Sequence, residues 1–242
     1  MKQKASLVSV IIPVFNGESY VAEAVDSIRR QQHRPLEIIV VDDGSTDGTA
    51  RVLSDLKHDD LRYVYQTNTG AAGALNTGLG LARGDFISFL DADDVWTDIK
   101  LQIQIPHLTE NVAVEVVLGY QQRMWSSAGA LELTPSELAL SLQSCVFRRE
   151  VFEKVGVFDQ TLRYCFGWDW FMRARELDVF IVVHPEVMSY YRRHDTNMTL
   201  QLEASNKEFA LILKRSLDRR RRRGLGPVSL AKFTNISELT RL

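Results

Sequence analysis

The chain has 242 residues, a formal net charge of -2 and 45% hydrophobic residues. This length and apolar content suffice for a packed core, and the near-zero charge excludes a general attraction to nucleic acid or membrane. Two cysteines, Cys145 and Cys165, are too few for a disulfide framework and indicate reduced core thiols in a cytoplasmic protein. No apolar run reaches the roughly 20 residues that span a bilayer, and the run from Leu7 to Phe15 lacks the cleavage pattern of a secretory signal.

The first 90 residues alternate between strand and helix patterns. A β-branched run over residues 7–14 ends at the turn Asn16-Gly17, which is typical of a strand buried on both faces. Apolar residues at helical spacing follow over residues 18–34, closed by Pro35. This order predicts an α/β fold with a Rossmann-like, mostly parallel sheet flanked by helices. The same pattern predicts strands over 36–41, 62–66 and 86–90 and helices over 49–57 and 69–84.

Beyond residue 96 the pattern becomes irregular, although no repeat or linker divides the chain. Pro106 is expected to stop a helix over 99–107, and the polar connection 120–136 is expected to be mobile. Further strands are predicted over 112–119, 142–147, 179–183 and 187–191, and helices over 149–155, 168–177 and 200–223.

Polar side chains follow each of the four predicted parallel strands. Asn16 follows the first, Asp42 and Asp43 the second, Asn68 the third, and a run of carboxylates at 91–94 the fourth. Ligands of open parallel sheets bind outside the carboxyl ends of the strands, so four polar loops favour one pocket. Each loop by itself is also ordinary turn chemistry.

Residues 91–94 place three carboxylates at the end of an apolar run. A divalent cation with a phosphorylated ligand would balance their charge. Alternatively, one Asp caps a helix that begins at Trp96 and Thr97.

Several segments occur together in a fixed order: SVIIPVFN (9–16), VVDDGSTD (40–47), NTG with ALN (68–76), GD (84–85) and LDADD (90–94). With residues 147–159 and the motif YRRH (191–194), this order resembles the family-2 glycosyltransferases of the GT-A fold over about residues 7–195.

The resemblance implies a single catalytic domain over 1–223 followed by a tail, 224–242. The domain would contain a nucleotide-binding half (about 1–98), an irregular acceptor-binding half (about 99–199) and a C-terminal helix (about 200–223). The implied reaction transfers a sugar from a nucleoside-diphosphate sugar to an acceptor hydroxyl, with inversion.

The resemblance also implies roles for residues at the strand ends. Asp43 would bind the nucleotide base, and a carboxylate that accepts an imide N–H favours a pyrimidine, hence a UDP-sugar, without excluding guanine. Asp91 would lie near the ribose. The implied nucleotide-binding residues are Pro13, Phe15, Glu18, Asp43, Asn68 and Asp91.

Asp91 and Asp93 match the DxD motif of the family. Asp93, together with His194 of the YRRH motif, would ligate the metal, and Asp94 would remain as a helix cap. Hard oxygen ligands and a diphosphate suit Mn²⁺ or Mg²⁺.

Inversion needs a carboxylate base that takes the proton of the acceptor hydroxyl. The resemblance assigns this catalytic role to Asp169, although Trp168 stands where the family has Glu. Asp169 could instead interact with the dipole at the start of a helix. Leu75 stands where many relatives carry a phosphate-binding Arg, so Arg83 or Arg192 would have to replace it.

The arginine-rich segment Lys214 to Arg223 is either a solvated helix face or, through residues 209–223, a peripheral contact with the inner face of an anionic membrane. Nucleic acid is not an expected partner, because no aromatic residues are interleaved with the arginines. The implied acceptor is a glycan or lipid-linked saccharide of polysaccharide or cell-envelope synthesis. Trp125 is either a sugar platform or a core residue. The oligomeric state is left open.

Two rival functions fit parts of the pattern. A nucleotidyltransferase also combines a Rossmann-like sheet with paired Asp residues, but Asn16-Gly17-Glu18 is not a glycine-rich phosphate loop. A noncatalytic module that binds nucleotide sugars would keep Asp43, Asp91 and Asp93 without needing a base.

Overall fold

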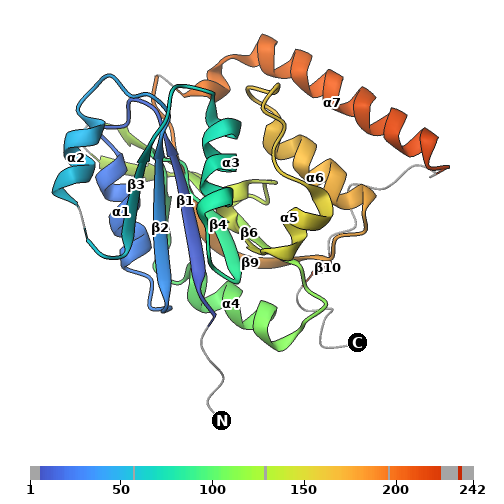
Figure 1. The fold of residues 1–242 in the computed structure, drawn as a ribbon, viewed down its shortest axis with the longest axis horizontal. Coiled ribbons are helices and arrows are strands. Elements are labelled where there is room, and N and C mark those ends of the chain that lie inside the picture. Colours follow the sequence, from blue (N-terminus) through green and yellow to red (C-terminus); the bar gives the residue numbers. More distant parts are fainter. Residues whose placement is uncertain (1–5, 57, 128–129, 196, 225–233, 236–242) are drawn as a thin grey trace.

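The computed structural model describes residues 6–56, 58–127, 130–195, 197–224 and 234–235. A ten-stranded sheet runs through both halves of the chain (Figure 1). Its strands are β1 (Val8–Val14), β2 (Leu36–Asp42), β3 (Leu61–Tyr65), β4 (Phe86–Phe89), β5 (Val95–Trp96), β6 (Val116–Ser127), β7 (Ala130–Leu133), β8 (Cys145–Arg148), β9 (Ile181–Arg192) and β10 (Thr234–Asn235). The main order is β10-β9-β6-β8-β4-β1-β2-β3, with β5 paired to β9 and β7 to β6.

The N-terminal strands β3, β2, β1 and β4 are parallel, as predicted. The apolar sequence of β1 reflects burial on both sides of the sheet. Val10 and Ile12 pack on one side, and Ile11 packs on the other. Both faces are therefore covered, which is the usual arrangement of a parallel sheet.

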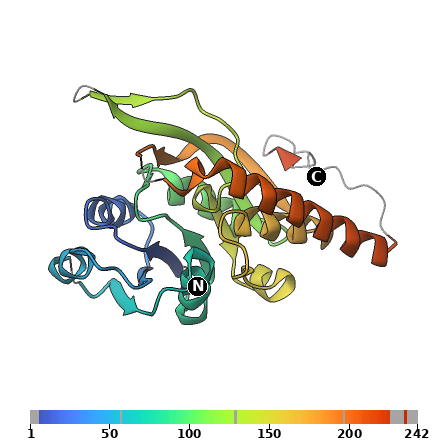
Figure 2. The same ribbon diagram turned by 90° about the horizontal axis from the view of Figure 1, so that it is seen from above.

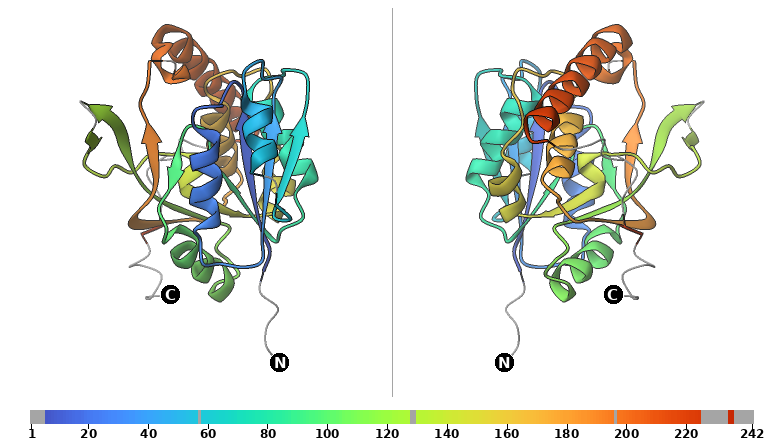
Figure 3. Two further views of the ribbon diagram at one scale, coloured as in Figure 1. Left: turned by 90° about the vertical axis from the view of Figure 1, so that its left-hand side faces the viewer. Right: turned by 90° about the vertical axis from the view of Figure 1, so that its right-hand side faces the viewer.

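Helices cover the two faces in separate groups (Figure 3). The helices are α1 (Val21–Arg29), α2 (Thr49–Asp55), α3 (Ala71–Leu81), α4 (Lys100–Glu110), α5 (Glu150–Val155), α6 (Phe166–Glu176) and α7 (Leu202–Arg222), with 3-10 turns η1 (Leu142–Ser144) and η2 (Met198–Leu200). The helices α1, α2 and α4 pack with Val10 and Ile12, whereas α3, α5 and α6 pack with Ile11. Helix α7 lies outside this layer, against α6 (Figure 1).

The second half is more ordered than its sequence pattern indicated. The connection predicted over 120–136 is largely strand, because β6 continues to Ser127 and pairs with β7. This hairpin projects from the body of the protein (Figure 2). The two strands predicted over 179–191 are one strand, β9, which pairs with β6 through register shifts near Tyr120. The strand predicted over 142–147 is η1 followed by β8.

Two helix boundaries differ from the prediction. Pro106 lies inside α4 and does not end it. The lost backbone bond would have gone to the carbonyl of Gln102, an exposed residue, so water can replace it. Trp96 does not begin a helix, since Val95 and Trp96 form β5 and pair with Tyr190 and Ser189.

Both cysteines are buried and free, as expected. Burial raises the pKa of the Cys145 thiol to about 12. Among the described residues, no helix combines the length and apolarity that crossing a membrane requires.

Candidate active site

The loops after β1 and β2 are joined into one rim at the carboxyl ends of the strands. The side-chain oxygen of Asn16 accepts a hydrogen bond from Thr46 N (2.8 Å), and the Glu18 carboxylate accepts one from Gly48 N (2.7 Å). Asn16 holds a positive φ of 54°, which Asn tolerates better than most residues. The rim leaves the Phe15 ring 54% exposed beside partly buried Pro13.

Asp43 is buried at this rim and organises the start of α3. One carboxylate oxygen accepts hydrogen bonds from Thr69 N (2.8 Å) and Gln66 Nε2 (2.7 Å), and the other accepts one from Gly70 N (2.8 Å). Asn68 supports the same loop by donating to the Asp43 carbonyl (2.8 Å). A carboxylate has about four acceptor positions, so the second oxygen retains capacity for one more donor.

The carboxylates after β4 lie close enough to perturb one another. Asp91 is exposed as a residue, but partial desolvation of its carboxyl and the negative charge of Asp93 raise its pKa. Desolvation and the charges of both neighbours also raise the pKa of buried Asp94 well above its ordinary value. One Asp94 oxygen has no hydrogen-bond partner. This excess of negative charge is the electrostatic setting in which a bound cation is stabilising.

Asp93 meets His194, as the resemblance implied, although the two residues are 101 positions apart. The His194 Nε2 lies 2.9 Å from an Asp93 carboxylate oxygen, and the Asn197 side-chain nitrogen lies 3.0 Å from Nε2. The His194 ring stacks on Tyr20, with centroids 5.2 Å apart. Sequence reasoning missed Tyr20 and Asn197, and neither stood in a motif that would have identified it.

The donor set around Asp93 fits a hard divalent cation. A carboxylate and an imidazole converge beside Asp91 and the unpartnered Asp94 oxygen. Within the part of the chain that the structure describes, no three His, Cys, Asp or Glu side chains are grouped as a metal site. Other positions in the coordination sphere would therefore come from water and from a ligand such as a diphosphate.

Asp94 is not a helix cap, because no helix begins next to it. Its side chain accepts a hydrogen bond from Arg192 N at 2.6 Å, which ties the residue before β5 to the end of β9. Of the two cations suggested to replace the Arg at position 75, Arg83 is excluded because it pairs with Glu37 at the opposite end of the sheet. Arg192 lies at the site and donates to the Asp93 carbonyl (2.8 Å).

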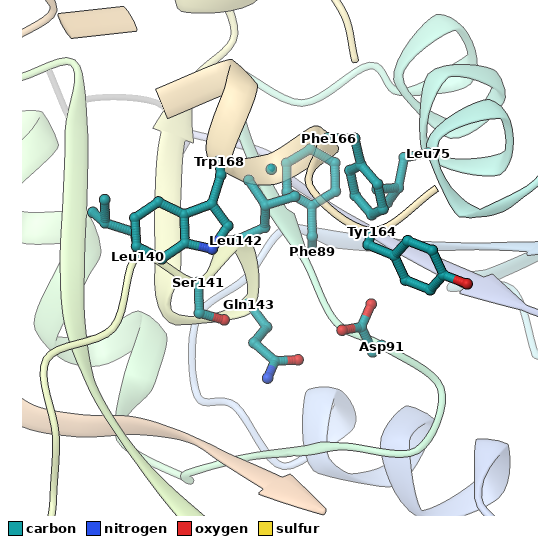
Figure 4. A pocket seen from close by; sticks show the side chains of 11 residues that line it. Leu75, Phe89, Asp91, Leu140, Ser141, Leu142, Gln143, Tyr164, Phe166 and Trp168 are labelled. Carbon is teal, nitrogen blue, oxygen red and sulfur yellow. The ribbon is translucent and has the colours of Figure 1, made fainter. Parts of the chain in front are cut away.

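A cavity of about 150 Å³ adjoins Asp91 (Figure 4). Aromatic and aliphatic side chains lie along one side of it, and the polar ends of Ser141, Gln143 and Asp91 lie along the other. The lining residues are Leu75, Phe89, Asp91, Leu140, Ser141, Leu142, Gln143, Tyr164, Phe166, Gly167 and Trp168. Residues 140–143 were not predicted, because they come from the irregular segment that offered no motif, whereas residues 166–168 precede the predicted base, Asp169. The combination of apolar rings with amide, hydroxyl and carboxylate groups suits a polar ring such as a sugar.

Asp91 is the predicted site residue that lines this cavity, whereas the predicted base, Asp169, does not. Asp169 lies in the first turn of α6 and is 3% exposed. One carboxylate oxygen accepts a hydrogen bond from Arg173 Nε at 2.8 Å, and the other lies 3.6 Å from an Arg219 nitrogen. The role of Asp169 as base stays a prediction, and the Asp169→Asn variant described below tests it. The helix directs Phe166, Gly167 and Trp168 to the cavity and turns Asp169 toward the arginines.

Comparison with known structures agrees with the fold. The structure of Staphylococcus aureus TarS 1–349 in complex with UDP-GlcNAc superposes with a TM-score of 0.72 over 86% of this chain and 65% of that chain, at 21% identity. The mannosyltransferase PcManGT from Pyrobaculum calidifontis, in complex with GDP-Man and Mn²⁺, gives a TM-score of 0.70 over 89% and 65%, also at 21% identity. At such identity the likeness establishes the fold, which is that of the GT-A glycosyltransferases.

Sequence comparison establishes the family. The model of Glycosyl transferase family 2 matches residues 9–156. An uncharacterised glycosyltransferase of Rickettsia typhi is 35% identical over 82% of this chain and 68% of its own length. The putative teichuronic acid biosynthesis glycosyltransferase TuaG of Bacillus subtilis is 41% identical over 47% of this chain and 46% of its own length. The chain belongs to glycosyl transferase family 2.

Proposed function

We propose that this glycosyltransferase moves a sugar from a nucleoside-diphosphate sugar, with a UDP-sugar favoured, to an acceptor hydroxyl. The observation that carries the proposal is the convergence of Asp91, Asp93 and His194 beside a sugar-sized cavity. The similar TarS structure contains UDP-GlcNAc, and PcManGT contains GDP-Man, so both nucleotides are tested below.

The donor roles proposed for the rim follow from exposure and acceptor capacity. Phe15 offers an exposed ring beside Pro13 for stacking of the base, and Asp43 retains an acceptor position for a base N–H. Glu18 accepts a hydrogen bond from Gly48 N, and Asn68 donates one to the Asp43 carbonyl. These hydrogen bonds are proposed to hold the loops around that site in place. Asp91, which faces the cavity, is proposed to contact the ribose.

Asp93 and His194 are proposed to hold Mn²⁺ or Mg²⁺. When bound, the metal would neutralise negative charge on the departing diphosphate. Arg192 is proposed to lie close to the diphosphate, since it is anchored on the Asp93 carbonyl and over the Tyr20 ring, and its guanidinium also pairs with Glu23 at 2.6 Å.

The acceptor is proposed to be a glycan or lipid-linked saccharide, and residues 1–223 are proposed to act as one catalytic domain. The similarity to a putative teichuronic acid biosynthesis enzyme supports a role in envelope polysaccharide synthesis. Inversion is proposed from the family resemblance, and the anomeric configuration of the product tests it. A product with retained configuration would contradict a single displacement.

A thermal-shift panel of UDP, GDP and their sugars, with and without Mn²⁺, tests the proposed function. A ligand that binds only the native state raises the melting temperature, and a hundredfold excess over Kd adds about 2.7 kcal/mol. We expect the largest shift for a UDP-sugar with Mn²⁺. No shift with any nucleotide would contradict the proposal. Binding without any transfer to saccharide acceptors would favour the noncatalytic module, and release of pyrophosphate from a nucleoside triphosphate would favour a nucleotidyltransferase.

We also propose peripheral contact between residues 209–223 and an anionic membrane. Arg215 and Arg219 are engaged within the protein, with Asp159 and Glu176. Other basic and apolar side chains of α7 remain at the surface. The exposed residues are Leu211, Leu213, Lys214, Leu217, Arg221, Arg222 and Arg223. Such a combination favours binding to anionic headgroups.

The protein is therefore expected to sediment with phosphatidylglycerol vesicles at low salt and to be released at high salt, because salt screens exposed charges. Changing Arg221 and Arg222 to Ser should reduce sedimentation severalfold. The matched control changes exposed Arg51 and Arg62 to Ser, at the other side of the protein. Failure to sediment at low salt, or equal binding to neutral vesicles, would refute membrane contact through these charges.

A further inference from the structure

The segment that enters α6 is held by a carboxylate from α7. The Glu208 side chain accepts hydrogen bonds from three successive backbone N–H groups: Arg163 N (2.8 Å), Tyr164 N (2.7 Å) and Cys165 N (3.0 Å). Backbone donors away from water need partners, and a carboxylate near a helix N-terminus also interacts favourably with the helix dipole. Glu208 thus satisfies three donors that lie immediately before the helix.

Further contacts join α7 to α6 on the C-terminal side of Glu208. Phe209 meets Trp168 edge to face, with ring centroids 5.7 Å apart. Toward the C-terminal end, Arg219 donates two hydrogen bonds to Glu176, at 2.7 and 2.9 Å, and Ser216 donates one at 2.6 Å. Helix α7 is therefore attached along the length of α6.

The segment from Tyr164 to Trp168, which α7 contacts, forms one wall of the candidate active site. Tyr164, Phe166, Gly167 and Trp168 all line the cavity beside Asp91 (Figure 4). The family match ends at residue 156, so this wall lies outside the matched region. Its position depends on contacts that this chain makes with its own C-terminal helix.

We propose that Glu208 is a positioning residue that holds the Tyr164–Trp168 wall against the sugar ring of the nucleotide-sugar donor. The inference rests on the proposed function, because it assigns the cavity beside Asp91 to that ring. Glu208 does not line the cavity and acts through the backbone of residues 163–165. The nucleotide rim around Asp43 belongs to other loops, so Glu208 should affect recognition of the sugar without affecting recognition of the nucleotide.

The test measures the affinities of UDP and UDP-GlcNAc, and of GDP and GDP-mannose, by titration calorimetry with Mn²⁺. In Glu208→Ala the affinity for UDP or GDP should stay within about twofold of wild type. The additional affinity that the sugar confers should fall by about tenfold, the size of a lost capping interaction. Glu208→Gln keeps one acceptor oxygen and should retain part of that affinity.

Glu203→Ala is the matched control, because it removes the same charge from the same helix. Glu203 is exposed and forms an ion pair with Lys207, one turn further along α7, at 2.6 Å. Its sugar-dependent affinity should equal that of wild type. Hydrogen exchange should be faster at the amides of 163–165 in Glu208→Ala and unchanged in the control.

The two proposals fail in different ways. If wild type binds none of the four ligands, the proposed function fails, and the inference fails with it. If wild type binds nucleotides but gains nothing from the sugar, or if the gain survives in Glu208→Ala while the 163–165 amides exchange faster, the inference alone is overturned. Should Glu208→Ala not fold, the same comparison is made with Glu208→Gln, whose unchanged sugar-dependent affinity despite faster exchange would overturn it.

Discussion

Asp169→Ala is expected to lower the free energy of unfolding by about 3 kcal/mol, because it breaks a buried ion pair. The Asp169 side chain is 4% exposed and that of its partner Arg173 is 18% exposed. Arg173 would keep its hydrogen bonds to the carbonyls of Val155 and Val157 but lose its neutralising charge. Arg219 lies 3.6 Å from Asp169 and would keep only its other anionic neighbour, Glu176. Urea denaturation measures the change.

The control for this loss is Asp98→Ala. It breaks an exposed ion pair with Arg30, in which the charged atoms are 2.9 Å apart, compared with 2.8 Å for Asp169 and Arg173. Exposed pairs contribute between zero and about 1 kcal/mol, so the control should change stability little. Equal losses in the two variants would contradict a structural role for Asp169. In a double-mutant cycle, Asp169→Ala and Arg173→Ala should be clearly non-additive, since the residues are in direct contact.

Asp169→Asn distinguishes the structural role from the catalytic one. Asn keeps an oxygen that can accept from Arg173 but removes the charge. If Asp169 positions α6, transfer should fall only as far as the stability of the fold does, with nucleotide binding retained. An Asn variant with wild-type stability and nucleotide affinity but no transfer would confirm the predicted role of Asp169 as base.

Asp93→Asn is expected to reduce the Mn²⁺-dependent affinity for the donor by at least about tenfold. The variant loses a charged oxygen ligand next to His194. It should also stabilise the metal-free protein, because the charge of Asp93 helps to raise the pKa values of Asp91 and Asp94. These opposite changes, weaker binding with higher metal-free stability, are specific to a charged cation site.

Calorimetry with and without Mn²⁺, together with urea denaturation in a chelator, checks both changes. Asp26→Asn is the control, since Asp26 is an exposed residue on α1. Its Mn²⁺-dependent affinity should match wild type. If Asp93→Asn bound the donor as tightly as wild type in Mn²⁺, the proposed metal site would be refuted.

Local patterns were sufficient to predict the strands and helices of the N-terminal half. The apolar run of β1 is buried on both faces, so its sequence indicates a parallel strand without tertiary information. Because parallel strands end at one edge of the sheet, the polar residues that follow them could be placed on one rim. The contact between Asp93 and His194, however, was inferred from resemblance. It depends on β9 returning beside β5, across 101 residues.

Tertiary contacts overrode local patterns in the second half. Asp94 resembles a helix cap in sequence, yet its partner is Arg192 N on a strand that is distant in the chain. Pro106 is a helix breaker by propensity, yet α4 continues past it because the unmatched carbonyl lies on an exposed residue. Neither partner is visible within a window of neighbouring residues.

The sequence by itself determined the parallel sheet, the family and the carboxylate cluster, because these depend on periodicity and on short motifs. Only the tertiary structure decided where Asp169, Glu208 and the residues lining the cavity lie. The side chains of a helix point in several directions. Which side chain of α6 contacts an arginine, and which lines the cavity, depends on how α6 packs against α7. That packing involves contacts between distant segments, for which the local pattern contains no signal.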